Sequence, residues 1–120
     1  MRFDEEFRRR TKQFASRIVR LYSRLPRERR EVEVLGHQLL RSGTSVAAHI
    51  REASRARSDS EFCSKCDVAL QEADESQLWM ELLDEDCRVG DSDLKPLHQE
   101  SDELIAILVT IVSKTRTGRG

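Results

Sequence analysis

The sequence predicts an all-α fold, an antiparallel up-down-up-down four-helix bundle that occupies residues 1–120 as a single domain. Apolar residues recur at steps of three and four in four long stretches, at residues 4–25, 28–56, 59–88 and 93–113. Break or cap signals separate these stretches, and the chain holds only five Gly and two Pro. After the last stretch, residues 114–120 are polar, and we expect them to form a frayed tail.

The first two predicted helices are separated by Pro26, because proline disfavours helical geometry at the residue before it. The apolar seam of the first comprises Phe7, Thr11, Phe14, Ile18, Leu21 and Leu25. The seam of the second comprises Val32, Leu35, Leu39, Ser42, Val46, either His49 or Ile50, and Ala53. Both sets keep the period of a helix and exclude the period of two that a strand would have.

The third predicted helix starts at a capping box, in which the Ser58 hydroxyl faces an early backbone N–H and Glu61 reaches back. Its seam comprises Phe62, Cys66, Ala69, Ala73, Ser76, Met80, Leu83 and Cys87. Gly90 and the following Asp-Ser-Asp end it and cap the fourth. The fourth seam comprises Leu94, Leu97, Ser101, Leu104, Leu108 and Ile111. Residues 104–112 are rich in β-branched side chains that would also suit a strand, but their register with the earlier seam residues favours a helix.

Composition bears on location and cofactors. The longest apolar run, residues 104–112, is far shorter than the roughly 20 residues that cross a bilayer, so we expect no membrane contact. The first residues are charged rather than a secretory leader, and Cys63, Cys66 and Cys87 are an odd number, which together predict reduced thiols and a cytoplasmic location. Cys63 and Cys66 sit inside a predicted helix with no second ligand pair, so neither a metal nor another cofactor is expected.

Charge is distributed unevenly. Residues 1–30 hold eleven Arg and Lys against four Asp and Glu, whereas residues 58–104 hold fifteen acidic residues against three basic ones. In the first helix Arg10, Arg17 and Arg24 are one heptad apart and form a stripe. Further basic residues widen it, namely Arg8, Arg9, Lys12 and Arg20.

Two interpretations of this basic stripe are open. It could neutralise phosphates of RNA or DNA without reading bases, since no aromatic residues are interleaved for base stacking. It could instead pair with carboxylates of the acidic third helix, within the chain or between subunits, through Glu72, Asp74, Glu75 and Glu81.

The third and fourth helices are more apolar than one buried seam requires, and this excess predicts a protein partner, by default a second copy. We expect an oligomer interface at Leu78, Trp79, Leu82, Ile105, Val109 and Val112. No nucleophile elbow, phosphate loop or acid-base pair is visible, so the sequence predicts no catalytic residues, no enzyme and no small-molecule substrate.

Residues 38–53 read QLLRSGTSVAAHIREA, and the third helix contains ALQEA at 69–73. This resembles the four-helix-bundle proteins encoded in intervening sequences of bacterial 23S rRNA genes, with His49 where that family usually has Asn. The resemblance spans almost the whole chain. It implies a homopentamer of four-helix bundles, no established enzymatic activity, and, through a related accessory protein of diversity-generating retroelements, contact with nucleic acid.

The motif also supplies a candidate polar network, at Arg41, Ser42, Ser45, His49 and Glu52. Buried charges need partners, so Arg41 and Glu52 could belong to an ion-pair network inside the bundle or at a subunit contact. The alternative is a ligand pocket. The neighbouring small residues, Gly43 and Ala47 among them, are expected to let another helix approach closely.

Overall fold

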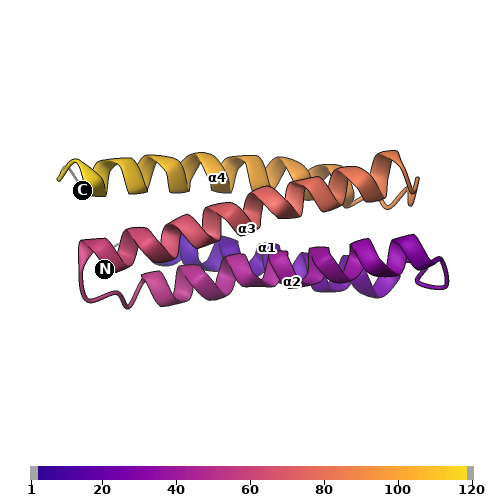
Figure 1. Cartoon of the computed structure of the whole chain (residues 1–120), viewed down its shortest axis with the longest axis horizontal. Coiled ribbons are helices and arrows are strands. Elements are labelled where there is room, and N and C mark those ends of the chain that lie inside the picture. Colours follow the sequence, from indigo (N-terminus) through magenta and orange to yellow (C-terminus); the bar gives the residue numbers. More distant parts are fainter. Residues whose placement is uncertain (1–2, 119–120) are drawn as a thin grey trace.

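The computed structural model describes residues 3–118, and that part of the chain forms four helices. They are α1 (Glu5–Arg24), α2 (Arg30–Ala53), α3 (Asp59–Glu85) and α4 (Leu94–Arg116). Figure 1 shows them running side by side in alternating directions, with short connections at the two ends of an elongated body. Each helix packs on the next, and α1 also packs on α4, so that the four close a ring in which α1 lies diagonal to α3. The predicted antiparallel four-helix bundle is therefore confirmed.

The helix ends follow the cap signals. The Asp4 carboxylate accepts a hydrogen bond from the backbone N–H of Phe7 at the start of α1. At the start of α3, the Ser58 hydroxyl accepts from the N–H of Glu61, and the Glu61 carboxylate accepts in return from the N–H of Arg57. These three side chains satisfy backbone donors that have no partner within the helix.

The C-terminal part of the chain differs from the expectation of a frayed tail after residue 113. Helix α4 continues to Arg116, because the Arg116 guanidinium reaches the Asp67 carboxylate of α3 and the Thr115 hydroxyl donates to the carbonyl of Ile111. Thr117 and Gly118 form a turn. The rest of the predicted tail, residues 119–120, lies outside the described residues.

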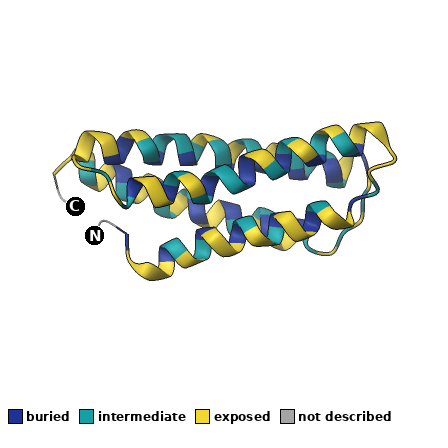
Figure 2. Cartoon of the chain, turned by 90° about the horizontal axis from the view of Figure 1, so that it is seen from below, coloured by how far each residue is buried: buried dark blue, intermediate teal, exposed yellow. Residues whose placement is uncertain are grey.

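The core lies along the inward faces of all four helices, as the dark blue segments in Figure 2 show. Every predicted seam residue of α1 and α3 is buried, as is Leu25 just past the end of α1 and Cys87 just past the end of α3. In α2 the core residue is Ile50, and His49 is only partly buried. In α4 the buried seam ends at Val112, which is 4% exposed, and the predicted Ile111 is only partly buried. Val112 therefore packs inside its own bundle and is not available to the oligomer interface at which it was expected.

Two glycines let α1 and α2 approach closely. A Cβ atom built on Gly43 would lie 2.3 Å from Cδ1 of Ile18, and one built on Gly36 would lie 2.6 Å from Cδ1 of Leu25. Ordinary carbon contacts are about 3.5–4.0 Å, so a methyl group at either position would displace its neighbour. The expectation that Gly43 brings two helices together is confirmed.

Candidate interaction surfaces

The three arginines that share a heptad position in α1 all bind carboxylates of the same chain. Arg10 holds Glu100 in a two-pronged contact, with nitrogen to oxygen distances of 2.6 and 3.1 Å. Arg17 Nη2 lies 2.8 Å from Asp93 Oδ1. Similar two-pronged geometry joins Arg24 to Asp91, at 2.9 and 3.1 Å. These contacts connect α1 to α4 and to the loop before it, which closes the ring of helices.

Electrostatics follows from this geometry. The hydrogen bond from Arg24 holds the pKa of the Asp91 carboxyl below its usual range, and it raises the pKa of the guanidinium. The hydrogen bond that Arg10 donates to the Glu100 carboxylate raises the pKa of Arg10 in the same way. Planar guanidinium groups in paired contact with carboxylates have much of their donor capacity already used. The interpretation that the stripe pairs with carboxylates thus holds for its three central members, but their partners lie on α4 and its preceding loop rather than on the acidic α3.

The four remaining basic residues of the predicted stripe do not form one surface with these three. Arg9 pairs with Glu6 on its own helix, at 2.6 Å. Arg20 is exposed. Arg8 and Lys12 line a groove between α1 and α2. The structure therefore divides the stripe between an intramolecular seam facing α4 and a groove facing α2.

This α1–α2 groove has a volume of about 490 Å³. Thr11, Ala47 and Ile50 lie along it, with charged groups on both of its helices. The charged lining comprises Glu5, Glu6, Arg8, Arg9, Lys12 and Arg51. Arg51 belongs to the motif of α2, but it was not predicted as a site residue. The sequence left either His49 or Ile50 as the core residue, so it did not place Arg51 relative to the core-facing stripe.

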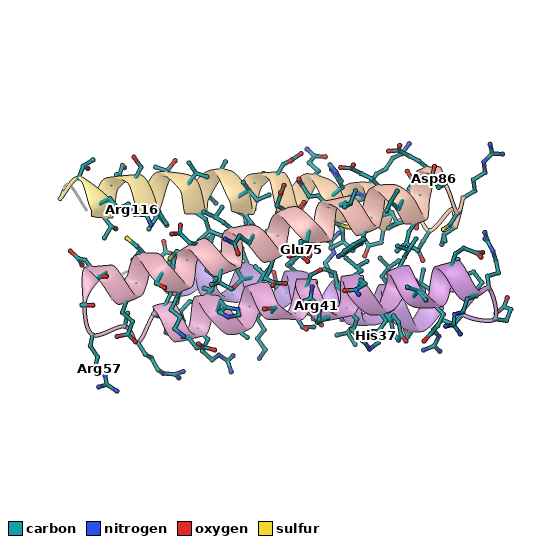
Figure 3. The ribbon with its side chains drawn as sticks, viewed as in Figure 1. His37, Arg41, Arg57, Glu75, Asp86 and Arg116 are labelled. Carbon is teal, nitrogen blue, oxygen red and sulfur yellow. The ribbon has the colours of Figure 1, made fainter. Side chains whose placement is uncertain are left out.

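The predicted polar network around the α2 motif is divided into separate contacts. Arg41 donates to Glu72 and Glu75 of α3, at 3.1 and 2.9 Å, and Figure 3 shows the labelled Arg41 and Glu75 side by side between the two helices. Glu52 instead accepts from Lys65 of α3 at 2.8 Å, and this hydrogen bond lowers the pKa of Glu52. Arg41 and Glu52 therefore each tie α2 to α3, and neither is buried.

The uncharged members of that network lie deeper. The hydroxyl oxygens of Ser42 and Ser76 are 2.8 Å apart in the buried contact between α2 and α3. Ser76 also donates to the carbonyl of Glu72. His49 Nδ1 lies 2.9 Å from the carbonyl oxygen of Ser45 and 3.0 Å from its hydroxyl, one turn away on the same helix. These polar groups are satisfied by local or interhelical partners.

The side chains expected at the oligomer interface have unequal exposure. Leu78 of α3 and Val109 of α4 are 46% and 52% exposed, which is high for large apolar residues. Leu82, Ile105 and Trp79 are partly buried, and the latter two pack against the core. Since α3 and α4 are neighbours, joined by the hydrogen bond from Gln77 to Asp102, the exposed apolar side chains belong to adjacent helices. We refer to Leu78, Leu82, Ile105 and Val109 as the α3–α4 apolar surface.

Other reactive side chains are distributed without a shared site. Cys63, Cys66 and Cys87 are buried, and none of them is in a disulfide bond. Within residues 3–118, no three His, Cys, Asp or Glu side chains are grouped closely enough to hold a metal ion. Across the same residues, no helix is both long and apolar enough to cross a membrane.

Comparison with known proteins decides the relationship of the chain. Residues 4–110 match the model of the 23S rRNA-intervening sequence protein family. The chain belongs to this family. A similar solved structure is that of a protein of unknown function from the S23 ribosomal protein family of Bacteroides thetaiotaomicron. It is 35% identical, with a TM-score of 0.80, and the match covers 88% of this chain and 97% of that one. No curated protein matches the chain.

Family membership confirms the resemblance drawn from the α2 motif and from the ALQEA segment of α3. In this intervening-sequence protein, the motif residues with described contacts join α2 to α1 through Gly43 and to α3 through Arg41, Ser42 and Glu52. The motif is accordingly placed where α2 meets both of its neighbours.

Proposed function

We propose that this member of the 23S rRNA-intervening sequence protein family is a non-enzymatic assembly module that associates with copies of itself. The observation that carries the proposal is the α3–α4 apolar surface, where Leu78 and Val109 are about half exposed on adjacent helices. Burial of apolar surface contributes about 25 cal/mol per Å², so covering two such side chains and their neighbours favours association. The subunit number that we propose is five, which is what the family resemblance implies.

A closed ring of identical subunits uses two different surfaces on each subunit. The α3–α4 apolar surface supplies one. For the other we propose the outer side of α1 and α2, where Val19 and Val34 are each 47% exposed. The assembly proposal assigns no nucleic-acid contact to Arg10, Arg17 and Arg24, because these three arginines already pair with carboxylates of their own chain.

Light scattering coupled to gel filtration tests this assembly. At micromolar concentration we expect a mass several times the 13.9 kDa of one chain. Changing Leu78→Lys together with Val109→Lys should return the mass to that of a single chain while the helical circular dichroism is retained, because each lysine would leave an unpaired charge at a buried contact.

The matched control adds the same charge at exposed positions outside both apolar surfaces. Ser92 lies in the loop before α4 and Ser113 lies near the end of α4, so Ser92→Lys with Ser113→Lys tests whether two added cations disturb assembly by themselves. The control should keep the wild-type mass. A wild-type protein that elutes with the mass of one chain would overturn the proposal, and a nuclease activity in the purified protein would contradict its non-enzymatic part.

A further inference from the structure

The α1–α2 groove contains two cationic side chains that have no ion-pair partner among residues 3–118. Lys12 lies on α1 and Arg51 on α2, and both are exposed. Within the described residues 3–118, neither takes part in an ion pair or a side-chain hydrogen bond. This distinguishes them from Arg10, Arg17 and Arg24, which bind carboxylates across the opposite side of α1.

The groove as a whole is positively charged. Four basic and two acidic side chains line it, and one of the acids, Glu6, is already bound by Arg9 at 2.6 Å. Arg8 precedes Lys12 by four residues, so the two lie on the same side of α1 and extend the charge along the helix axis. An anion in the groove would therefore meet cations on both helices.

The groove accounts for the small side chain of Ala47, which close helix packing does not explain. Toward the other end of the α1–α2 contact, the space above Gly36 and Gly43 is filled by side chains of α1, Leu25 and Ile18. At Ala47, one turn after Gly43, the same two helices instead leave an open groove. Thr11 beside it is buried, and its hydroxyl donates to the carbonyl of Arg8. A small, uncharged floor with cations at its rim fits an anionic ligand that enters from solvent.

We propose that the α1–α2 groove binds the phosphate groups of a nucleic-acid backbone. Arginine offers a planar pair of donors that matches phosphate oxygens, and lysine supplies a compact charge. No aromatic side chain lines the groove, so bases have nothing to stack on and the binding is independent of sequence. This binding site is an addition to the proposed assembly. Its lining does not include Val19 or Val34, the exposed residues of the second proposed subunit contact.

Fluorescence anisotropy with a labelled RNA duplex of about 20 base pairs tests the groove, with salt varied from 50 to 200 mM. Each phosphate contact contributes about 0.9 to the slope of log affinity against log salt. The variant Lys12→Gln with Arg51→Gln should therefore flatten that slope by up to about two units and weaken binding at least about tenfold at 50 mM salt.

The matched control removes one lysine and one arginine elsewhere. Arg20→Gln with Lys95→Gln alters two exposed cations outside the groove and produces the same change in net charge. The control should retain more than half of the wild-type affinity. An equal loss in both double variants would show that binding follows net charge and would overturn the groove, as would undetectable binding of the wild type at 50 mM salt.

Two further measurements separate the sources of phosphate and the role of assembly. Unlabelled duplex should displace the labelled duplex at far lower phosphate concentration than inorganic phosphate does, and equal displacement would overturn the assignment to a nucleic-acid backbone. The mass of both double variants should remain that of the wild type. Lost binding with an unchanged mass supports the groove whether the wild type is an oligomer or a single chain, whereas lost binding together with altered mass would overturn it.

Discussion

The close approach of α1 and α2 at Gly43 makes Gly43→Ala a sensitive test of the packing. The added Cβ would lie 2.3 Å from Cδ1 of Ile18 and 3.2 Å from its Cγ2. Ile18 is fully buried, so its side chain has no solvent-filled space to move into. Cδ1 can move away by rotation about the Cβ–Cγ1 bond alone. Cγ2 is attached directly to Cβ, so it moves only if the χ1 rotamer or the backbone changes.

Two opposing effects determine the expected free energy of unfolding. Alanine in a helix interior is more favourable than glycine by about 1 kcal/mol. Adding a methyl group to a filled core costs about 1–3 kcal/mol. The contact with Cγ2 places Gly43→Ala in the middle of that range, so we expect a net destabilisation of about 1 kcal/mol. For a domain of this size the Tm should fall by about 4 °C.

A double-mutant cycle attributes this cost to Ile18. Ile18→Val removes Cδ1, the atom at 2.3 Å, and leaves Cγ2 in place. In the wild-type background that change should cost about 0.5–1.5 kcal/mol. In the Gly43→Ala background it should cost less, with a coupling of at least about 0.5 kcal/mol. Urea unfolding followed by far-UV circular dichroism measures all four proteins, at one protein concentration because association would shift the transition.

Gly36→Ala is the matched control. Its Cβ would contact a terminal methyl of Leu25 at 2.6 Å, but Tyr22 stays at 3.4 Å or beyond. Only that terminal methyl lies closer than 3.4 Å, and it can move by a side-chain rotation without shifting the backbone, so we expect stability within about 0.5 kcal/mol of wild type. The reasoning fails if Gly43→Ala matches or exceeds wild-type stability, or if Ile18→Val costs the same in both backgrounds.

Two further predictions concern polar contacts. Ser76→Ala should lower the free energy of unfolding in urea by about 1–2 kcal/mol, because the buried Ser42 hydroxyl loses its partner at 2.8 Å and keeps only the Leu39 carbonyl at 3.4 Å. Adding Ser42→Ala should recover part of that loss, and a purely additive loss would contradict this expectation. The lowered pKa of Asp91 means that its pairing with Arg24 stabilises the fold above the unfolded pKa near 4 and is lost as pH falls through the folded value. Since Arg24 is almost half exposed, we expect this ion pair to contribute less than about 1 kcal/mol to the loss of unfolding free energy between pH 5 and 3. Asp91→Asn should lack that contribution, and an equal acid dependence of stability in both proteins would refute the prediction.

The bundle could be predicted because its elements are encoded locally. The apolar steps of three and four in α1 are the same residues that the structure buries, from Phe7 to Leu25. The Ser58 cap of α3 is equally local, since its partner is three residues away. Where the period allowed two neighbouring residues, as at His49 and Ile50, only the rotation of α2 against both of its neighbours selected the buried one.

The interaction surfaces could be predicted only in part, because charge counts along a chain do not specify neighbours. The stripe through Arg10 was correctly located on α1, but its partner Glu100 is 90 residues away and becomes adjacent only when the ring closes. An intramolecular pairing with α3 would have required diagonal helices to touch. Arg51 was missed because a single arginine carries no pattern until α1 supplies the opposite wall of the groove.

The ring that the four helices of one chain close also has a consequence for chain connectivity. Three of its four helix contacts are bridged by short loops, while the α1–α4 contact is bridged only through the entire chain. The start of α1 and the end of α4 lie at the same end of the body (Figure 1). A linker joining them, with a cut at the Pro26 break, would give the order α2, α3, α4, α1 without separating any packed pair. Arg10 and Glu100 would then meet within one hairpin, so the native order is one of four cyclic permutations that this packing accommodates.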